Sequence, residues 1–287
     1  MVLLAAILFP SIGRARASAG RSLCDVRLKA IALALNAHRQ ENGQYPSNLA
    51  SLSEKKYLTE PLRCSNDPRQ DGSYEDFYVV RAPRSNSERP ILVCPFHEQV
   101  GSHGEQAYAS GSSYTKQFTT RPAVLELANS VTLLRPGKNP IAATSGMALY
   151  GGDRLQTGGS GMAKIRFADT SVAELAGGTD ITVLQSFMEG QSQAPLYSLV
   201  RQKTGEATYT VNHGSKFDVV TPTTTAGALG TKFKIVVDDN GNTTLTVIEG
   251  QVYVTTLEKS ALAVIGTVTA IIPSLPGLPT LPSLPGL

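Results

Sequence analysis

The sequence predicts an α+β protein: a long N-terminal helix with a small antiparallel sheet, then an all-β domain and a Leu/Pro-rich tail. Three observations support this prediction. Apolar residues recur at helical spacing near the N-terminus, alternate with polar residues through most of the second half, and lie between closely spaced prolines at the end. The expected divisions are 1–121, 122–258 and 259–287.

Length and composition exclude several classes of protein. A chain of 287 residues favours two domains of ordinary size. Hydrophobic residues make up 41% and charged residues 17%, which is too apolar for a disordered chain. The net charge of +3 gives no general electrostatic argument for binding nucleic acid, so we expect no such partner.

The first residues, MVLLAAILF, form an apolar run that Pro10 ends. This run is about half of the roughly 20 residues that span a bilayer as a helix. Two interpretations remain: a signal peptide with a small-residue site at 17–19, or the end of a longer apolar helix. The basic residues follow the run, whereas a signal peptide carries them before it, and this favours the second interpretation. They are Arg14, Arg16, Arg21, Arg27 and Lys29.

The segment after Gly20 has the pattern of an amphipathic helix. Cys24, Leu28, Ile31 and Leu35 recur at spacings of four, three and four, and the helix is expected to end in QENGQYP. We interpret Cys24 as a small buried hydrophobic residue on this stripe rather than a redox or metal-binding group.

The stretch LLAAILFPSIGRARASAGRSLCDVRLKAIALALNAHRQENGQYPSNLASL resembles the N-terminal region of type IV pilin-like proteins and type II secretion pseudopilins, over about residues 2–60. The resemblance implies a membrane-tethered subunit of the cell envelope, with a pilin-like head and other pilin-like subunits among its partners. The family's processing site, a Gly followed by Phe with a Glu at the fifth mature position, is absent, as is the first half of the membrane helix.

Two strands are expected in the region that follows, DFYVV and PILVC, packed on the helix stripe. Cys64 lies just ahead of the first strand and Cys94 ends the second. We predict a disulfide between them that closes a loop of about 30 residues and stabilises by roughly 3 kcal/mol. Cys24 then remains unpaired, because three cysteines cannot all pair within one chain.

Two alternatives to the disulfide stay open. The first is a zinc site formed by Cys94, His97 and His103, with Cys64 as the fourth ligand. Only Cys94 and His97 have close ligand spacing, however, and there is no paired CxxC. The second alternative is two unpaired thiols.

From about residue 124 the apolar pattern has a period of two. AKIRF places Ala163, Ile165 and Phe167 on one face, and TKFKIVV repeats the pattern before a turn at Asn240-Gly241. This alternation predicts an all-β domain with one buried face, in which the hairpin around Asn240 is part of the framework.

The motifs of this region resemble those of the FecR-type domain, over about residues 124–257. They are GDRLQTG, RFADTS and the series TPT, GTKF and VIEGQV, in that order. The resemblance implies an extracytoplasmic β-rich module, best known in iron-transport regulators that pass a signal from the outer membrane to a sigma factor. Those regulators carry a cytoplasmic helical domain and a membrane helix ahead of the module, whereas this chain carries the pilin-like region.

These observations predict a non-enzymatic envelope protein that presents its β domain to protein partners, with an extracytoplasmic sensor or signal-transduction component as the alternative. Catalysis is not expected, because the four histidines form no helix-borne pair and the Gly-rich segments lack P-loop spacing. We expect no cofactor, no resident metal and no small-molecule substrate. The expected location is the inner membrane facing the periplasm, contacted through the N-terminal helix, or the cell surface.

Overall fold

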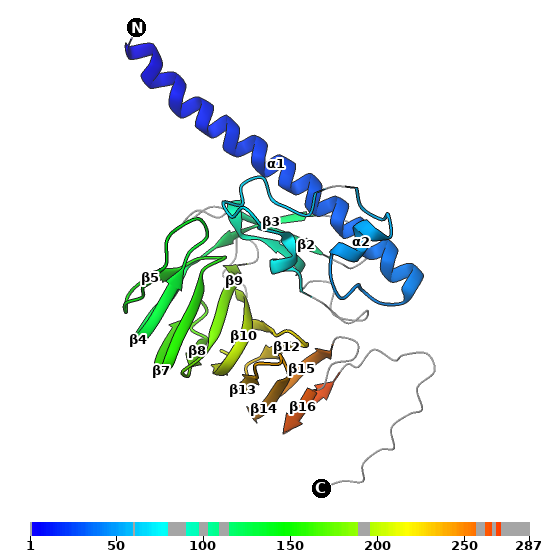
Figure 1. The fold of residues 1–287 in the computed structure, drawn as a ribbon, viewed down its shortest axis with the longest axis vertical. Coiled ribbons are helices and arrows are strands. Elements are labelled where there is room, and N and C mark those ends of the chain that lie inside the picture. Colours follow the sequence, from blue (N-terminus) through cyan, green and yellow to red (C-terminus); the bar gives the residue numbers. More distant parts are fainter. Residues whose placement is uncertain are drawn as a thin grey trace.

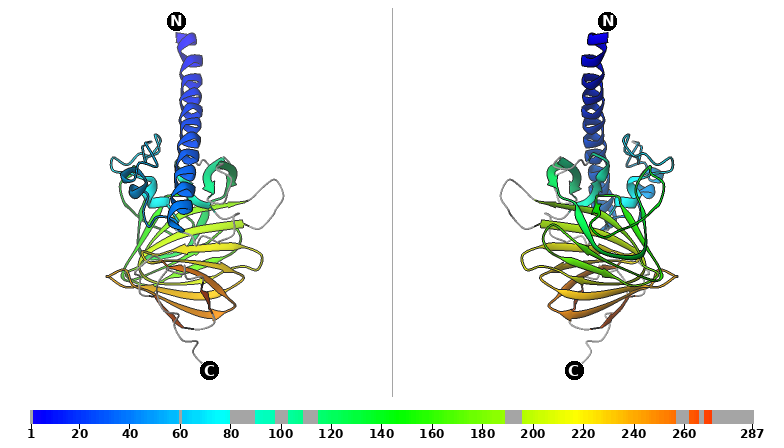
Figure 2. Two further views of the ribbon diagram at one scale, coloured as in Figure 1. Left: turned by 90° about the vertical axis from the view of Figure 1, so that its right-hand side faces the viewer. Right: turned by 90° about the vertical axis from the view of Figure 1, so that its left-hand side faces the viewer.

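The computed structural model describes residues 2–59, 61–79, 90–97, 103–108, 115–188, 196–256, 262–265 and 268–270. A β-rich body lies below one long helix, α1, whose N-terminal end projects beyond the body (Figure 1). The two side views in Figure 2 show the strands running across the body beneath this helix. The second half of α1 is therefore the part that contacts the rest of the chain.

Helix α1 (Val2–Asn42) buries the predicted apolar stripe: Cys24, Leu28, Ile31 and Leu35 have no exposed surface. Among the side chains of this helix that the structure describes, Leu23, Val26 and Leu33 are large, apolar and exposed. The helix ends at Gly43, which adopts φ +76° and donates its N–H to the Arg39 carbonyl at 2.8 Å. Glycine suits this position because it adopts a left-handed conformation without steric cost.

No helix among the described residues combines the length and apolarity needed to cross a membrane.

Short elements connect α1 to the sheet. They are α2 (Ala50–Glu54), the 3₁₀-helices η1 (Tyr74–Phe77) and η2 (Pro95–His97), and the strands β1 (Pro90–Cys94), β2 (His103–Tyr108) and β3 (Thr115–Thr120). PILVC forms β1 as predicted. The strand predicted at DFYVV is wrong over its described residues, because Phe77 ends η1 and Tyr78 makes only an isolated bridge to Leu92. Ser73 caps η1 by accepting the Glu75 N–H, which favours the helical turn.

The remaining strands form most of the body. They are β4 (Ala123–Leu134), β5 (Ile141–Ala142), β6 (Ala148–Leu149), β7 (Arg154–Arg166), β8 (Val172–Leu175), β9 (Asp180–Met188), β10 (Leu196–Thr210), β11 (Lys216–Val220), β12 (Thr224–Leu229), β13 (Lys232–Val237), β14 (Thr243–Glu249), β15 (Val252–Thr256), β16 (Leu262–Ile265) and β17 (Val268–Ala270). All of the named strands belong to one hydrogen-bonded sheet.

Strand β10 is the centre of this topology. It pairs antiparallel with β8, β9 and β13 and parallel with β11. Its Gln202 is fully buried and all of its contacts are internal: the amide nitrogen donates to the carbonyls of Gly205 and Ile235, and the amide oxygen accepts from the Tyr209 hydroxyl at 2.9 Å. A buried amide that is satisfied in this way stabilises one strand register over its neighbours.

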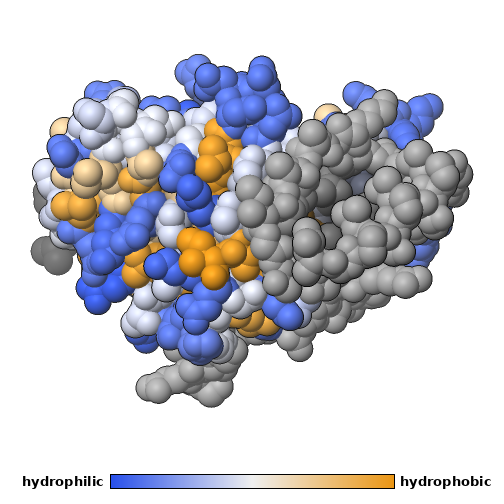
Figure 3. Space-filling model, turned by 90° about the horizontal axis from the view of Figure 1, so that it is seen from below, coloured by the Kyte–Doolittle hydropathy of each residue, from blue (hydrophilic) through white to orange (hydrophobic). Residues whose placement is uncertain are grey.

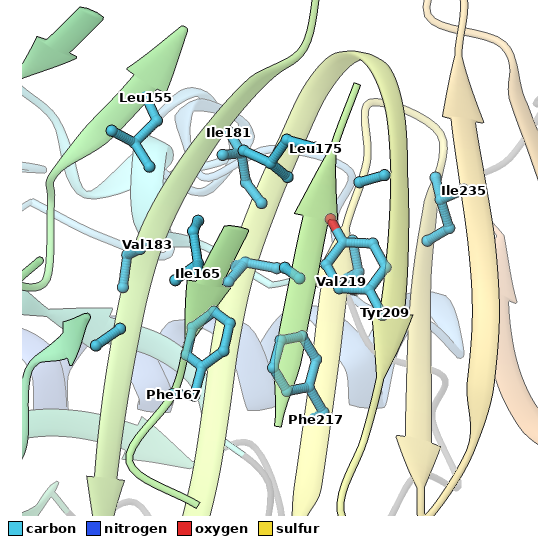
Figure 4. Close-up of a cluster of buried hydrophobic side chains, with 14 of the residues drawn as sticks. Leu155, Ile165, Phe167, Leu175, Ile181, Val183, Tyr209, Phe217, Val219 and Ile235 are labelled. Carbon is cyan, nitrogen blue, oxygen red and sulfur yellow. The ribbon is translucent and has the colours of Figure 1, made fainter. Parts of the chain in front are cut away.

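The larger core lies between the strands of residues 123–254. The predicted alternation is confirmed: Ile165, Phe167, Phe233 and Ile235 are buried, and Lys232 is exposed. Aromatic rings fill the centre (Figure 4), with Phe167 edge-on to Phe217 at 4.9 Å between ring centroids. Phe233 stacks on Tyr209 at 5.2 Å. The period-two pattern therefore places its apolar residues on one buried face.

The turn that joins β13 to β14 is the one that Asn240-Gly241 predicts. Gly241 adopts φ +82°, and its N–H donates to the Asp238 carbonyl at 2.9 Å. The Asp238 carboxylate accepts from the backbone N–H groups of Asn240 and Asn242, and its hydrogen bonds with Asn242 lower the pKa of Asp238.

A second core joins α1 to the sheet. It contains the helix stripe, β1 and the aromatic residues of η1, together with Leu184, Tyr197, Leu199 and Val220 from β9, β10 and β11. The expected head and the expected β domain therefore share buried side chains. The predicted domain divisions at residues 121 and 258 stay a prediction.

The predicted α+β fold class, with a long helix carrying a separate small sheet as a pilin-like head, is wrong. The fold is mostly β, and the described α-helices are α1 and the single-turn α2. Strand β1 pairs with β2, β2 with β3, and β3 with β9 through Thr119–Met188 and Thr120–Phe187. Strand β1, expected in a separate head, therefore extends the main sheet together with β2 and β3.

Part of the predicted C-terminal tail is also strand. Strand β16 pairs parallel with β14, and β17 pairs parallel with β15. The apolar run ALAVIGTVTAII thus extends the sheet edge over its described residues, while the Leu/Pro-rich residues 271–287 lie outside the described part of the chain.

Replacing Phe233 by Ala should lower the free energy of unfolding by about 3–5 kcal/mol, because it leaves a cavity against Tyr209 in a close-packed core. The matched substitution Lys232→Ala, one residue earlier on the exposed face, should change it by less than about 0.5 kcal/mol. Urea unfolding followed by circular dichroism measures both values. Equal effects at the two positions would contradict the assigned inward face of β13.

The fragment 124–257 should fold as a β unit, because its own strands supply the larger core. It should also bind an apolar dye more strongly than the full chain does, since Leu184, Tyr197, Leu199 and Val220 lose their cover from α1 and β1. Circular dichroism and dye fluorescence measure these two properties. A disordered or helical spectrum would mean that the β strands need the N-terminal region to fold.

Candidate functional site

The first recognisable motif, GDRLQTG, is built into the framework. The buried Asp153 carboxylate accepts two hydrogen bonds from the Arg135 guanidinium, at 2.9 and 2.8 Å, and one from the Tyr150 N–H. Arg135 also donates to the Ala148 carbonyl and lies over the Tyr150 ring. This two-point ion pair connects the end of β4 to the turn before β7.

The rest of this motif connects β7 to the neighbouring strand β9. Arg154 donates two hydrogen bonds to the Asp180 carboxylate, which raises the pKa of Arg154. The Thr157 hydroxyl donates to the Ala176 carbonyl at 2.6 Å and accepts the Thr179 N–H at 2.8 Å. These polar groups therefore form hydrogen bonds within the strands and turns of the fold itself.

The second motif, RFADTS, forms a turn that holds a distant loop. The Asp169 carboxylate accepts from the Ser171 N–H and hydroxyl, at 3.0 and 2.7 Å. Asn212 donates its backbone N–H to the Ser171 hydroxyl and its amide to the Asp169 carbonyl, both at 3.0 Å. The motif therefore fixes the end of β10 to the turn between β7 and β8.

The third motif series places threonine hydroxyls where loops cross. Thr243 contacts the hydroxyls of Thr221 and Thr223, at 2.7 and 2.8 Å, and Thr231 donates to the Gln251 carbonyl at 2.8 Å. As in the first two motifs, each hydroxyl bonds to the protein's own framework. The polar groups of the three motifs that are described above therefore stabilise the fold of the β domain.

A cleft of about 670 Å³ lies where the N-terminal region meets the β domain. Residues 69 and 75–78 line one side, and β10, β11 and the ends of β4, β7 and β9 line the other. Its charged lining residues are Arg69, Glu75, Asp76, Arg135, Lys138, Arg154, Asp180, Arg201 and Lys203. Six of these are basic and three are acidic, so the cleft carries excess positive charge.

Half of the basic residues in the cleft already have a carboxylate partner. Arg69 pairs with Asp67 and Asp76, Arg135 with Asp153, and Arg154 with Asp180. Lys138, Arg201 and Lys203 have no ion pair within 4.0 Å among the described residues. Arg201 interacts electrostatically with Asp76 and Glu75, whereas Lys138 and Lys203 supply positive charge that no ion pair among the described residues offsets.

Arg201 differs from the other cations because its Nε is buried without a hydrogen-bond partner among the described residues. Its Nη2 donates to the Tyr78 carbonyl at 2.8 Å, which connects β10 to the segment after η1. Burial lowers the pKa of Arg201, and the charges of Asp76 and Glu75 oppose this shift. A buried N–H with no acceptor is costly, and an anionic group in the cleft would relieve that cost.

A second cluster brings together the three cysteines, from three separate elements. Cys24 lies on α1, Cys64 in the loop before η1, and Cys94 at the end of β1; all three are buried. Their sulfur atoms lie within 4.8 Å of one another, and no disulfide joins any two of them. The Tyr74 hydroxyl lies 3.0 Å from Cys24 Sγ, and the Asn66 N–H donates to Cys64 Sγ at 3.4 Å.

The electrostatics of this cluster favour neutral thiols. A hydrogen bond with Cys64 is the main cause that raises the pKa of Cys24, and burial is the main cause that raises the pKa of Cys94. Burial also raises the pKa of Tyr74. Without a cation or an oxidant the three sulfurs behave as small, weakly polar core groups.

Sequence reasoning found two of the three thiols as a pair and missed the third. Cys64 and Cys94 converge as predicted, and their disulfide stays a prediction. Cys24 is buried on the helix stripe as expected, but it also contacts the cluster. The side chains of His97 and His103, considered as zinc ligands, lie outside the described residues. The spacing of Cys24 along the chain carries no signal of this contact, because helix packing alone creates it.

The fold and its polar networks define a β-sheet module whose signature residues form hydrogen bonds within its own framework. Residues 153–253 match the family described as FecR protein, so the chain carries a FecR domain there. This match lies outside residues 2–60, so the pilin-like resemblance gains no support from it. Searches of curated proteins and of solved structures gave no match.

Proposed function

We propose that this chain is a non-enzymatic, extracytoplasmic component of a sensing or signal-transduction system. The observation that carries the proposal is the FecR domain at residues 153–253, whose motif residues are used for the framework. This favours the sensor interpretation over a filament subunit, since the pilin-like interpretation rests on the N-terminal stretch alone.

The cleft is the surface that we assign to a protein partner. It lies between the FecR domain and the segment 69–78, so a bound partner contacts both at once. Binding there would couple the position of α1 and its neighbours to occupancy of the β domain, which is what a signalling component requires. Lys138 and Lys203, which form no ion pair among the described residues, and the buried Nε–H of Arg201 favour an acidic segment of the partner.

The surface of the β domain agrees with a polar recognition site. Figure 3 views the molecule from below, and on its described part the hydrophobic surface is broken into small areas between hydrophilic ones. Large apolar patches characterise many obligate interfaces. The described part of this face lacks a patch of that kind, which agrees with a partner that binds mainly through charge and hydrogen bonds.

Location is part of the same proposal. The apolar residues 2–9 lie on the end of α1 that projects beyond the body, and basic residues follow them (Figure 1). An end of this kind suits contact with a membrane, where the basic side chains meet lipid headgroups. The β domain would then face the periplasm or the outside of the cell.

The full-length gene product should sediment with the membrane fraction of its own cells and be digested by protease added to spheroplasts. Deleting residues 1–20 should release it in soluble form, because this stretch precedes Cys24, the first buried residue among the described side chains of α1. Immunoblots of the fractions measure both outcomes. A soluble, protease-protected cytoplasmic protein would contradict the assigned location.

A labelled hexaglutamate peptide should bind the purified protein, and the substitution Lys203→Gln should weaken this binding about tenfold, the effect of losing one charge-assisted contact. Arg201→Gln should weaken it at least as much. Lys232→Gln is the matched control, because it removes an exposed charge outside the cleft. Fluorescence anisotropy at two salt concentrations measures the affinities.

Equal loss of affinity in Lys203→Gln and in Lys232→Gln would mean that the peptide responds to overall charge, and the cleft assignment would fail. Because Arg201 also bonds to the Tyr78 carbonyl, Lys203 provides the cleaner test. A hexalysine peptide should show no binding.

A further inference from the structure

We propose that the reduced cysteine cluster, Cys24, Cys64 and Cys94, is a binding site for a thiophilic d¹⁰ metal ion, with Zn²⁺ as the ion that the site accepts. Thiolate sulfur is a preferred ligand of such ions. The proposal goes beyond the sensing function and does not depend on it, because the cluster lies in the second core rather than in the cleft.

The positions of the sulfurs are close to those of a metal–thiolate site. A zinc–sulfur bond of about 2.3 Å in tetrahedral geometry places two sulfur ligands about 3.8 Å apart. The three sulfurs here all lie within 4.8 Å of one another. A contraction of about 1 Å or less therefore converts the cluster into three ligands of one ion, which side-chain rotation can supply.

Two of the three sulfurs are each in contact with a hydrogen-bond donor. The Asn66 N–H donates to Cys64 Sγ, and the Tyr74 hydroxyl contacts Cys24 Sγ, where it can donate to a thiolate. Groups that donate to ligand atoms hold them in place and stabilise their negative charge.

The charge balance favours a divalent ion. Binding releases one proton from each thiol, so three thiolates and one Zn²⁺ carry a net charge of −1. Arg21 and Arg27 lie three residues on either side of Cys24 along α1, and the Nε of each is buried without a hydrogen-bond partner among the described residues. These cations are available on the same helix to offset the remaining charge.

An occupied site would connect three elements that are far apart in the sequence. Cys24 holds α1, Cys64 holds the loop before η1, and Cys94 holds β1. Because the ion binds only when these elements are together, its binding energy stabilises the docked position of α1. The ion would therefore support the junction on which one side of the cleft is built.

The test uses the full chain, reduced, freed of metal and titrated with Zn²⁺ against a colorimetric chelator. One equivalent should bind, and Co²⁺ in its place should give thiolate-to-cobalt charge-transfer absorption in the near ultraviolet.

The substitution Cys24→Ala should abolish metal binding because it removes one ligand. The variant should still fold, since Ala is close to Cys in size, and circular dichroism checks this. Tyr74→Phe should weaken binding about 10- to 100-fold. Leu23→Ala, exposed on the same helix, is the matched control and should bind as the parent chain does.

Oxidation provides the second arm. Diamide accepts two electrons and two protons as the Cys64 and Cys94 sulfurs form a disulfide, which should expel the ion and leave Cys24 as the thiol that alkylation labels after unfolding. This outcome supports both the predicted bridge and the metal site. Failure of the reduced chain to bind Zn²⁺, or equal binding by Cys24→Ala, would overturn the metal site. The cleft proposal is tested separately by peptide binding and would be unaffected.

Discussion

The structure depends on strand β10 and on the burial of side chains on both of its faces. Val200, Ala207 and Tyr209 belong to the larger core, whereas Tyr197 and Leu199 belong to the core beneath α1. The same strand hydrogen-bonds to β8, β9, β11 and β13. An element with partners on all sides cannot shift register without breaking several ladders at once, so β10 sets the position of its neighbours.

This arrangement is compatible with the proposed binding site on a domain whose motif residues serve its framework. The motif residues Asp153, Asp169 and Thr221 form hydrogen bonds that hold turns and connect neighbouring strands. Arg201 and Lys203 lie on the same central strand, on the side that faces the N-terminal region. The rigidity of the sheet therefore positions the charges, while the second element of the cleft comes from outside the domain.

The two proposed sites lie on either side of one junction. The cysteine cluster holds α1, the loop before η1 and β1 together, and η1 continues into the residues that line the cleft. Tyr74, the first residue of η1, contacts Cys24 Sγ, and the next three residues of the same 3₁₀-helix line the cleft. The two proposed sites are therefore neighbours along one short element.

Local patterns in the chain were sufficient for the buried helix stripe, for strand β1, for the inward faces of β7 and β13, and for the turn at Asn240-Gly241. Each of these depends on residues within a few positions of one another, where periodicity and backbone preference act directly. The FecR motifs were recognisable for the same reason, since their order along the chain can be read from the sequence directly.

Tertiary packing decided the rest of the structure. It merged the expected head into the main sheet through the β3–β9 pairing, placed Asp76 and Phe77 of DFYVV in a 3₁₀-helix, and brought Cys24 to Cys64 and Cys94. It also formed the cleft, whose cations come from strands and loops far apart in the sequence. Contacts of this kind arise when elements bury their faces against one another, and no spacing along the chain encodes them.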